Sequence, residues 1–204
     1  MNNYAELKSI IADYLNRDDL TTIIPTFIRL AESKFNRSLR VRQMIVRATA
    51  EIETAFFAPP GDWLETKEFQ LNTNPITRLE YITESEGNRL RQTRFVAPGQ
   101  PRFFTVVGSQ LEFIPTPDSI YQGELTYYAK IPSLSDSTTS NWLLAYAPDL
   151  YLYGALVEAE PYLKNDERLP VWGELYLRVM ADIEAADERA SVASTPLVRA
   201  RSLG

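Results

Sequence analysis

The sequence contains neither cysteine nor histidine among its 204 residues. Without cysteine the chain can form no disulfide, and it offers no thiolate nucleophile or thiolate ligand for zinc or an iron–sulfur cluster. Without histidine it has no histidine-based catalytic triad, no imidazole metal ligand and no histidine pH switch. Carboxylate, lysine and tyrosine chemistry remain open, but the composition favours a protein with no catalytic chemistry, no cofactor and no metal.

Long apolar runs and glycine-rich loops are also missing. No run of about 20 apolar residues, the length that crosses a bilayer, occurs. The N-terminal Met-Asn-Asn-Tyr-Ala-Glu lacks the basic start and apolar stretch of a signal peptide. The eight glycines are scattered and form no phosphate-binding or calcium-binding loop pattern. We therefore expect a protein that stays in the cytoplasm where it is made and has no membrane contact.

The net charge of −6 is ordinary for a soluble protein, but the charges are unevenly distributed. Residues 29–47 carry a net charge of +5 and residues 149–188 carry −7. After Glu188 no acidic residue remains, whereas three arginines follow. Opposed patches in one chain suit head-to-tail contact between copies of it. The competing interpretation is that each run is merely a solvated helix face.

Both ends of the chain show helical periodicity. Apolar residues at three- and four-residue spacing predict a helix over residues 4–15 and a second helix from an N-cap at Thr21 to about Arg42. After a polar linker over residues 131–141, helix returns near Trp142 and is interrupted at Pro161. A last helix is predicted from about Pro170 to Ala190, with Val171, Leu175, Val179 and Ile183 on one stripe.

Between residues 44 and 130 the period changes to two and turn residues multiply, which predicts about six short strands. The pair Gly108-Ser109 predicts a type II′ hairpin between residues 103–107 and 110–114. We expect an α+β fold: a helical bundle built from the N- and C-terminal helices, with an inserted small antiparallel β domain. The expected parts are an N-terminal helical hairpin over 1–43, the β domain over 44–130, a linker with C-terminal helices over 131–191, and a flexible tail over 192–204.

Paired carboxylates are the catalytic chemistry that the composition leaves open. With the abundant aromatic residues they make a carbohydrate site imaginable. Neighbours in sequence point to different faces of a helix, and aspartate at a helix break commonly caps, so a structural role is favoured. A carboxylate-based glycoside or cell-wall hydrolase, and a sugar- or peptide-binding module, stay as alternatives. The pairs are Asp18-Asp19, Glu158/Glu160, Asp166-Glu167 and Asp187-Glu188.

The aromatic residues also permit a stacking platform for single-stranded nucleic acid. On the predicted strand over residues 125–129, Leu125, Tyr127 and Ala129 share one face, which is typical of a core. Tyr128 points the other way, without interleaved basic residues. The pattern favours packing or subunit contact. For the basic run after Arg29, a salt bridge to an acidic helix of another subunit is favoured over contact with phosphate, which would be independent of DNA sequence.

Several stretches, taken in order, resemble the head-to-tail adaptor (connector) proteins of tailed phages. They are Tyr-Ala-Glu-Leu at 4–7, Ile-Pro-Thr-Phe-Ile-Arg-Leu-Ala-Glu at 24–32, Asn-Arg-Ser-Leu-Arg at 36–40, Pro-Gly-Asp-Trp-Leu-Glu at 60–65, Gly-Gln-Pro-Arg-Phe-Phe at 99–104, Leu-Glu-Phe-Ile-Pro-Thr-Pro at 111–117, Tyr-Tyr-Ala-Lys-Ile-Pro-Ser-Leu-Ser at 127–135 and Leu-Tyr-Leu-Tyr-Gly-Ala-Leu-Val-Glu-Ala at 150–159. The sequence departs from the family pattern at residues 59–63, where a smaller or aliphatic residue is expected in place of Trp63.

The resemblance implies a structural protein of the virion neck rather than an enzyme. Its implied partners are the portal protein, further copies of itself in a ring (typically of twelve copies), a downstream tail or neck protein, and DNA that passes through the channel. The C-terminal segment would reach the portal and become ordered on docking. Residues expected to dock on the portal are Pro196, Leu197, Val198, Arg199, Arg201 and Leu203. Residues expected between subunits are Arg29, Lys34, Arg37, Arg40, Arg42, Glu158, Glu160, Glu174 and Glu184.

Overall fold

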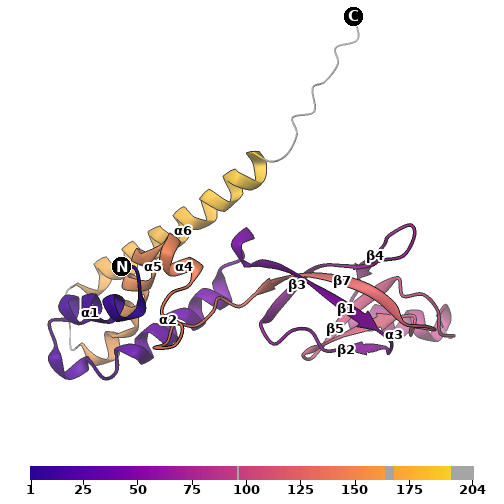
Figure 1. Cartoon of the computed structure of the whole chain (residues 1–204), viewed down its shortest axis with the longest axis horizontal. Helices are drawn as coiled ribbons and strands as arrows, with labels where there is room; N and C mark the ends of the chain where they lie inside the picture. The colour runs from indigo at the N-terminus through magenta and orange to yellow at the C-terminus, as the bar shows by residue number, and fades with distance from the viewer. Residues whose placement is uncertain (96, 164–167, 194–204) are drawn as a thin grey trace, which may run out of the picture. The chain divides into compact units, whose positions relative to one another are not determined.

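The computed structural model describes residues 1–95, 97–163 and 168–193. It divides into two compact units: Met1–Gln43 together with the chain from Ile131 onward, and Met44–Lys130. Helices make up the first unit and strands dominate the second (Figure 1). We refer to them as the helical unit and the β unit.

The helical unit is built around α5 (Pro148–Glu158), which is buried on most of its sides. The helices α1, α2 and α6 pack against α5, so the N-terminal and C-terminal parts of the chain share one core. The rings of Phe35 and Tyr151 meet edge to face, with centroids 5.2 Å apart. The remaining elements are α1 (Tyr4–Leu15), the 3₁₀ turn η1 (Asp18–Leu20), α2 (Ile24–Ser38), α4 (Trp142–Tyr146), η3 (Glu160–Tyr162) and α6 (Leu169–Ala193).

The helix ends follow from local chemistry. Asn3 caps α1 because its Oδ1 accepts a hydrogen bond from the backbone N–H of Glu6 at 2.9 Å. The helix stops at Asn16, whose φ of 51° lies in the left-handed region. The predicted cap of α2 at Thr21 is wrong, since the helix starts at Ile24 and no side chain caps it. It ends at Ser38, before the predicted Arg42, because Leu39 adopts an extended conformation.

Gly154 of α5 lies against Phe35 and Ala31 of α2. A Cβ atom at this position would stand 2.9 Å from Cζ of Phe35, a ring that is itself fully buried. Gly154→Ala is therefore expected to lower the free energy of unfolding by about 2 kcal/mol through overpacking. Gly173→Ala in α6 is the matched control, because a Cβ there meets nothing within 4 Å. Chemical denaturation should show a loss for the first variant alone, and an equal effect of both would contradict the close approach.

In the β unit, the described residues form a seven-stranded sheet in the order β1-β7-β3-β4-β5-β6-β2. Only three residues link β1, at one edge, to β2, at the other. They span at most about 14 Å, counted from the last residue of β1 to the first of β2. A flat sheet of this order would be about 29 Å wide, so the sheet must curl into a half-barrel. The strands are β1 (Ile45–Ile52), β2 (Phe56–Phe57), β3 (Trp63–Leu71), β4 (Thr77–Tyr81), β5 (Phe103–Val107), β6 (Gln110–Ile114) and β7 (Tyr121–Ala129), preceded by the turn η2 (Arg42–Met44).

The predicted hairpin is confirmed, with β5 and β6 paired in register across Gly108 and Ser109. The φ of Gly108 is 62°, as the first central residue of a type II′ turn requires. The concave side of the sheet holds an aromatic core, in which the ring centroids of Phe69 and Phe113 lie 5.1 Å apart.

One helix of the β unit, α3 (Glu84–Thr93), is absent from the sequence-based prediction. It connects β4 to β5, which run parallel, and parallel neighbours need such a crossover. Thr83 caps it, and Thr83 followed three residues later by Glu86 is a capping-box pattern that could have revealed it. An ion pair between Arg91 and Glu112 joins α3 to β6.

The fold class predicted from the sequence is wrong. In the described residues the chain is a mixed α/β protein dominated by the curled seven-stranded sheet, not a helical bundle with a small inserted antiparallel β domain. The sheet is not purely antiparallel, because β4 and β5 are parallel. The difference arises from α3, whose crossover makes β4 and β5 parallel where the sequence pattern predicts only antiparallel strands.

Candidate functional site

The basic run of the sequence separates into exposed and internally paired residues. On α2, Thr26, Arg29, Leu30, Ser33 and Arg37 lie on the side opposite the core; we call them the α2 outer face. Arg29 Nη2 donates to Thr26 Oγ1 at 3.3 Å and Arg37 Nη1 to Ser33 Oγ at 2.7 Å, so neutral hydroxyls orient both guanidinium groups. Leu30, between them, is 45% exposed.

The other basic residues of the run contact their own chain. Lys34 forms an ion pair with Glu158 of α5 in the same chain. The sequence analysis predicts that both residues contact a neighbouring subunit. The Nε of Arg42 lies 3.5 Å from Oδ1 of Asp187, which also accepts from the backbone N–H of Arg42. Arg40 donates to the backbone carbonyls of Asn36 and Leu39.

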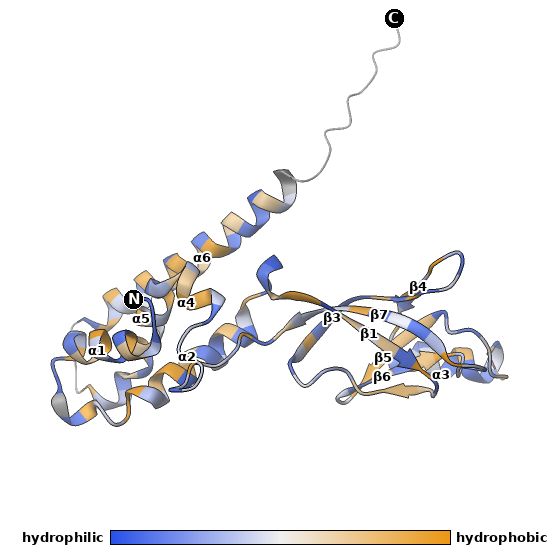
Figure 2. Ribbon diagram, in the orientation of Figure 1, coloured by the Kyte–Doolittle hydropathy of each residue, from blue (hydrophilic) through white to orange (hydrophobic). Residues whose placement is uncertain are grey.

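The exposed side of α6 carries an excess of acidic side chains, since Glu174, Asp182, Glu184 and Glu188 are exposed together with the basic Arg178 and Arg189. Glu174, Leu177, Ala181, Glu184 and Glu188 follow one another along this side; we call them the α6 outer face. Leu177 is 66% exposed, the largest value among the exposed large hydrophobic residues described. Figure 2 shows hydrophilic and hydrophobic residues alternating along α6. Glu160 is also exposed, in η3.

The acidic residue within the basic run is not on the surface. Glu32 is 2% exposed, and its Oε1 accepts hydrogen bonds from the backbone N–H of Leu134 at 2.7 Å and from the hydroxyl of Tyr151 at 3.2 Å. One turn later, Asn36 Oδ1 accepts from the backbone N–H of Ile131 at 2.8 Å. Burial raises the pKa of the Glu32 carboxyl. Glu32 and Asn36 therefore fix the segment by which the chain returns to the helical unit.

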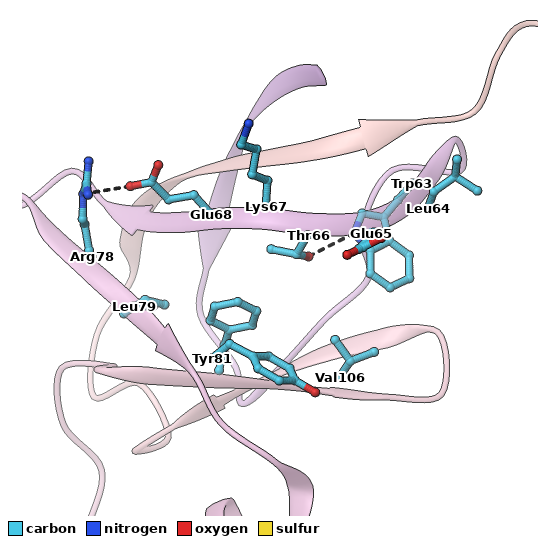
Figure 3. Close-up of a pocket in the computed structure, with 11 residues that line it drawn as sticks. Trp63, Leu64, Glu65, Thr66, Lys67, Glu68, Arg78, Leu79, Tyr81 and Val106 are labelled. Carbon is cyan, nitrogen blue, oxygen red and sulfur yellow. Dashed lines mark hydrogen bonds and ion pairs between the residues drawn. The ribbon is translucent and has the colours of Figure 1, made fainter. Parts of the chain in front are cut away.

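The β unit has an open cleft of about 760 Å³ between β3 on one side and β4 and β5 on the other. Trp63 and Thr66 on β3 face Tyr81 and Val106 across it (Figure 3). The indole Nε1 of Trp63 donates to Thr66 Oγ1 at 3.0 Å, and Tyr81 is 58% exposed. Trp63 is the residue at which the sequence departs from the adaptor pattern.

The paired carboxylates do not assemble into a catalytic site in the described residues. Asp19 is held by Arg17 through two hydrogen bonds of 2.7 Å, which lower its pKa. Glu158 and Asp187 are paired with basic residues as described above, and Asp166 and Glu167 lie outside the described residues. Residues 1–95, 97–163 and 168–193 contain no cluster of three or more acidic side chains arranged to hold a metal ion.

The aromatic residues of β7 follow the sequence prediction. Tyr127 is 3% exposed and its hydroxyl donates to Asp62 Oδ1 at 3.0 Å. Burial and this carboxylate raise the pKa of Tyr127 to about 12. Tyr128 lies on the opposite face of the strand, where the ammonium of Lys67 approaches its ring. Among the helices of the described chain, none combines the length and apolarity needed to span a bilayer.

Charged helix faces with exposed leucines and an open cleft in a sheet are typical of proteins that contact other macromolecules. Comparison with known families identifies it more closely. The family described as SU10 adaptor protein matches residues 2–200, and the chain belongs to that family. The resemblance to phage head-to-tail adaptors is thereby confirmed. A search of curated proteins found no match. Membership in an adaptor family indicates a structural component of a phage particle.

The predicted contact residues are distributed unevenly over these features. Arg29 and Arg37 lie on the α2 outer face, and Glu174 and Glu184 lie on the α6 outer face. The residues predicted to dock on a portal, Pro196, Leu197, Val198, Arg199, Arg201 and Leu203, are outside the described residues. Sequence reasoning missed Leu30 and Leu177, because single apolar residues outside a periodic stripe carry no signal before the buried side of the helix is known.

Proposed function

We propose that copies of this chain form a ring below the phage portal, which extends the DNA channel and presents a docking surface for the tail. The family match supports an adaptor role. The observation that carries the ring is the pair of oppositely charged outer faces on α2 and α6 of one compact unit, each with an exposed leucine.

The two faces are different surfaces, so contact between them is heterologous, and repeated heterologous contacts close into a ring when the rotation allows it. Arg29 and Arg37 of one copy would lie beside Glu174 and Glu184 of the next, with Leu30 against Leu177. The leucines supply apolar burial, and the charges fix the register and exclude the α2–α2 and α6–α6 pairings. Lys34 and Glu158 stabilise the copy itself instead.

We also propose that the ring contacts the portal, a tail or neck protein and the DNA. Residues 196–203 dock on the portal, and docking orders this segment, so that the ring forms on a finished portal rather than in solution. A downstream tail or neck protein binds the far side of the ring. DNA passes through the ring, and contact with its phosphates is independent of sequence.

Deletion of residues 194–204 tests the portal contact. The truncation ends directly after α6, so the circular dichroism spectrum and the unfolding midpoint should match those of the full chain. Attachment to purified portal should be lost in a co-sedimentation assay. A truncated protein that still sediments with the portal would overturn the docking role of this segment.

A further inference from the structure

Strand β4 is too short to fill its place in the sheet. It lies between β3 and β5, but it pairs only with residues 69–71 of β3 and residues 103–104 of β5. It ends there because Thr83, two residues further on, caps α3. Within the part of the chain that the structure describes, no strand continues β4 between residues 66–68 and 105–107. The cleft of the β unit lies at this gap, which is one strand position wide and in line with β4.

The two strands that border the gap each have one backbone edge in use. On the side away from the gap, β3 pairs with β7 from Trp63 to Leu71, and β5 pairs with β6 throughout. A strand that enters the gap must pair with β3 on one side and with β5 on the other, so both of its own edges must be free. A strand that already belongs to a sheet does not meet this condition. The edge strands of a second copy are therefore excluded, and an extended segment outside any sheet is required.

The side chains inside the gap are apolar or carry hydroxyl groups. Trp63 and Thr66 of β3 face Tyr81 and Val106 across it (Figure 3). Tyr81 is the last residue of β4, and its ring centroid lies 5.6 Å from that of Phe104. Side chains of a strand alternate between its two faces. An entering segment therefore needs small or apolar side chains at its inward positions.

The rim of the gap has no net charge. Glu65 and Glu68 are acidic, and Lys67 and Arg78 are basic. Glu68 and Arg78 form an ion pair, with 2.8 Å between Oε1 of the first and Nε of the second. The ammonium of Lys67 lies 5.9 Å from the centroid of the Tyr128 ring. Charge complementarity therefore favours a segment whose outward positions are uncharged over a strongly basic or acidic one.

The chain itself is a poor source of such a segment. Its linker over residues 131–141 is fixed to the helical unit, where the backbone N–H groups of Ile131 and Leu134 donate to α2. Residues 189–204 carry three arginines and no acidic residue, so a neutral rim does not select them. The matching segment is therefore expected on another protein, as a stretch that becomes ordered on binding.

We propose that an extended, uncharged segment of the downstream tail or neck protein adds as a strand between β3 and β5, in line with β4. Its backbone bonds to residues 66–68 and 105–107, and its inward side chains contact Trp63 and Tyr81. This inference rests on the proposed function, in which a downstream protein binds the ring while residues 196–203 bind the portal. Main-chain hydrogen bonds and shape, rather than charge, supply the affinity of this contact.

Amide hydrogen exchange tests the site in the intact assembly. Exchange is measured for the free chain, for the chain on purified portal, and for that complex after purified tails of the same phage are added. Hydrogen-bonded amides exchange slowly, so slower exchange in residues 66–68 and 105–107 is expected in the third sample only. Slower exchange on the portal alone would assign the gap to the portal or to a neighbouring copy and overturn the inference. Unchanged exchange in the third sample would overturn it as well.

A charge inside the gap tests the same contact by a different readout. Tyr81→Asp changes a residue that is 58% exposed, so the fold should be kept. Tail attachment should weaken roughly tenfold, as for loss of an aromatic anchor in an interface, and portal attachment should be unchanged. Phe56→Asp is the matched control, because Phe56 is 52% exposed on β2 at the end of the strand order.

Equal weakening by both variants, or no weakening by Tyr81→Asp, would overturn the site. If the ring forms and the tail attaches without slowing exchange in the gap, this inference fails while the proposed function stands.

Discussion

Arg29→Glu combined with Arg37→Glu should abolish ring assembly on the portal, with the fold unchanged. Both guanidinium groups are on the α2 outer face and bond only to hydroxyls in the described chain, so no internal ion pair is lost. Reversal places two negative charges against the acidic α6 outer face, and like charges across an interface cost several kcal/mol. Co-sedimentation with purified portal at low salt measures the loss.

The same reasoning predicts a rescue. Adding Glu174→Arg and Glu184→Arg to the doubly reversed protein restores opposite charges with exchanged signs, and assembly should return. Arg94→Glu with Arg102→Glu is the matched control, because it makes the same change in net charge on exposed residues of the β unit. Assembly of the doubly reversed protein at the normal level, or equal loss in the control, would contradict the charge model.

Glu32→Ala should lower the free energy of unfolding by about 3 kcal/mol, because the Leu134 N–H and the Tyr151 hydroxyl lose their buried acceptor. Glu32→Gln keeps an acceptor oxygen for Leu134 and should be tolerated. The contrast between the two variants separates the hydrogen bonds from the charge. Urea denaturation of the three proteins at one pH measures the contrast.

The pH dependence of stability gives a second readout for Glu32. Burial raises its pKa above the ordinary value of 4.5, so between the two pKa values the folded state binds more protons than the unfolded state. The contribution of this group to stability therefore falls as the pH rises through that interval. Glu32→Gln should remove that part of the slope above pH 4.5. An unchanged slope in the variant would show that the carboxyl titrates normally in the fold.

The helices at both ends of the chain could be predicted because they bury one side. Ile24, Phe27, Ile28, Ala31 and Phe35 of α2 recur at helical spacing, and all are buried. The stripe predicted for α6 was less accurate. Val171 is 53% exposed, whereas Trp172 and Met180, just beside the predicted stripe, are buried. The apolar residues of this helix lie on more than one of its sides, so periodicity alone could not identify the buried side.

The closure of the β unit could not be predicted, because it depends on pairings between residues distant in sequence. The link of three residues from β1 to β2 resembles a hairpin turn, yet the two strands lie at opposite ends of the strand order. The short β4 leaves the edges of β3 and β5 open, and no local pattern encodes where pairing stops. The cleft is a product of this topology.

Which basic residues of the run are exposed could not be predicted from the sequence either. Ser33 and Lys34 are adjacent, but one faces outward beside Arg37 while the other reaches Glu158. A net charge counted along the sequence includes Lys34 and Glu158 in the same way as exposed residues, although the two form an ion pair within one copy. Only the packing of α2 against α5 distinguishes charges that stabilise one copy from charges available to a neighbour.

Electron microscopy of the protein bound to its portal tests the central claim most directly. We expect a closed ring in which the α2 outer face of each copy lies against the α6 outer face of the next, with Leu30 and Leu177 in contact. Isolated copies on the portal, or a ring in which both faces point to solvent, would contradict it.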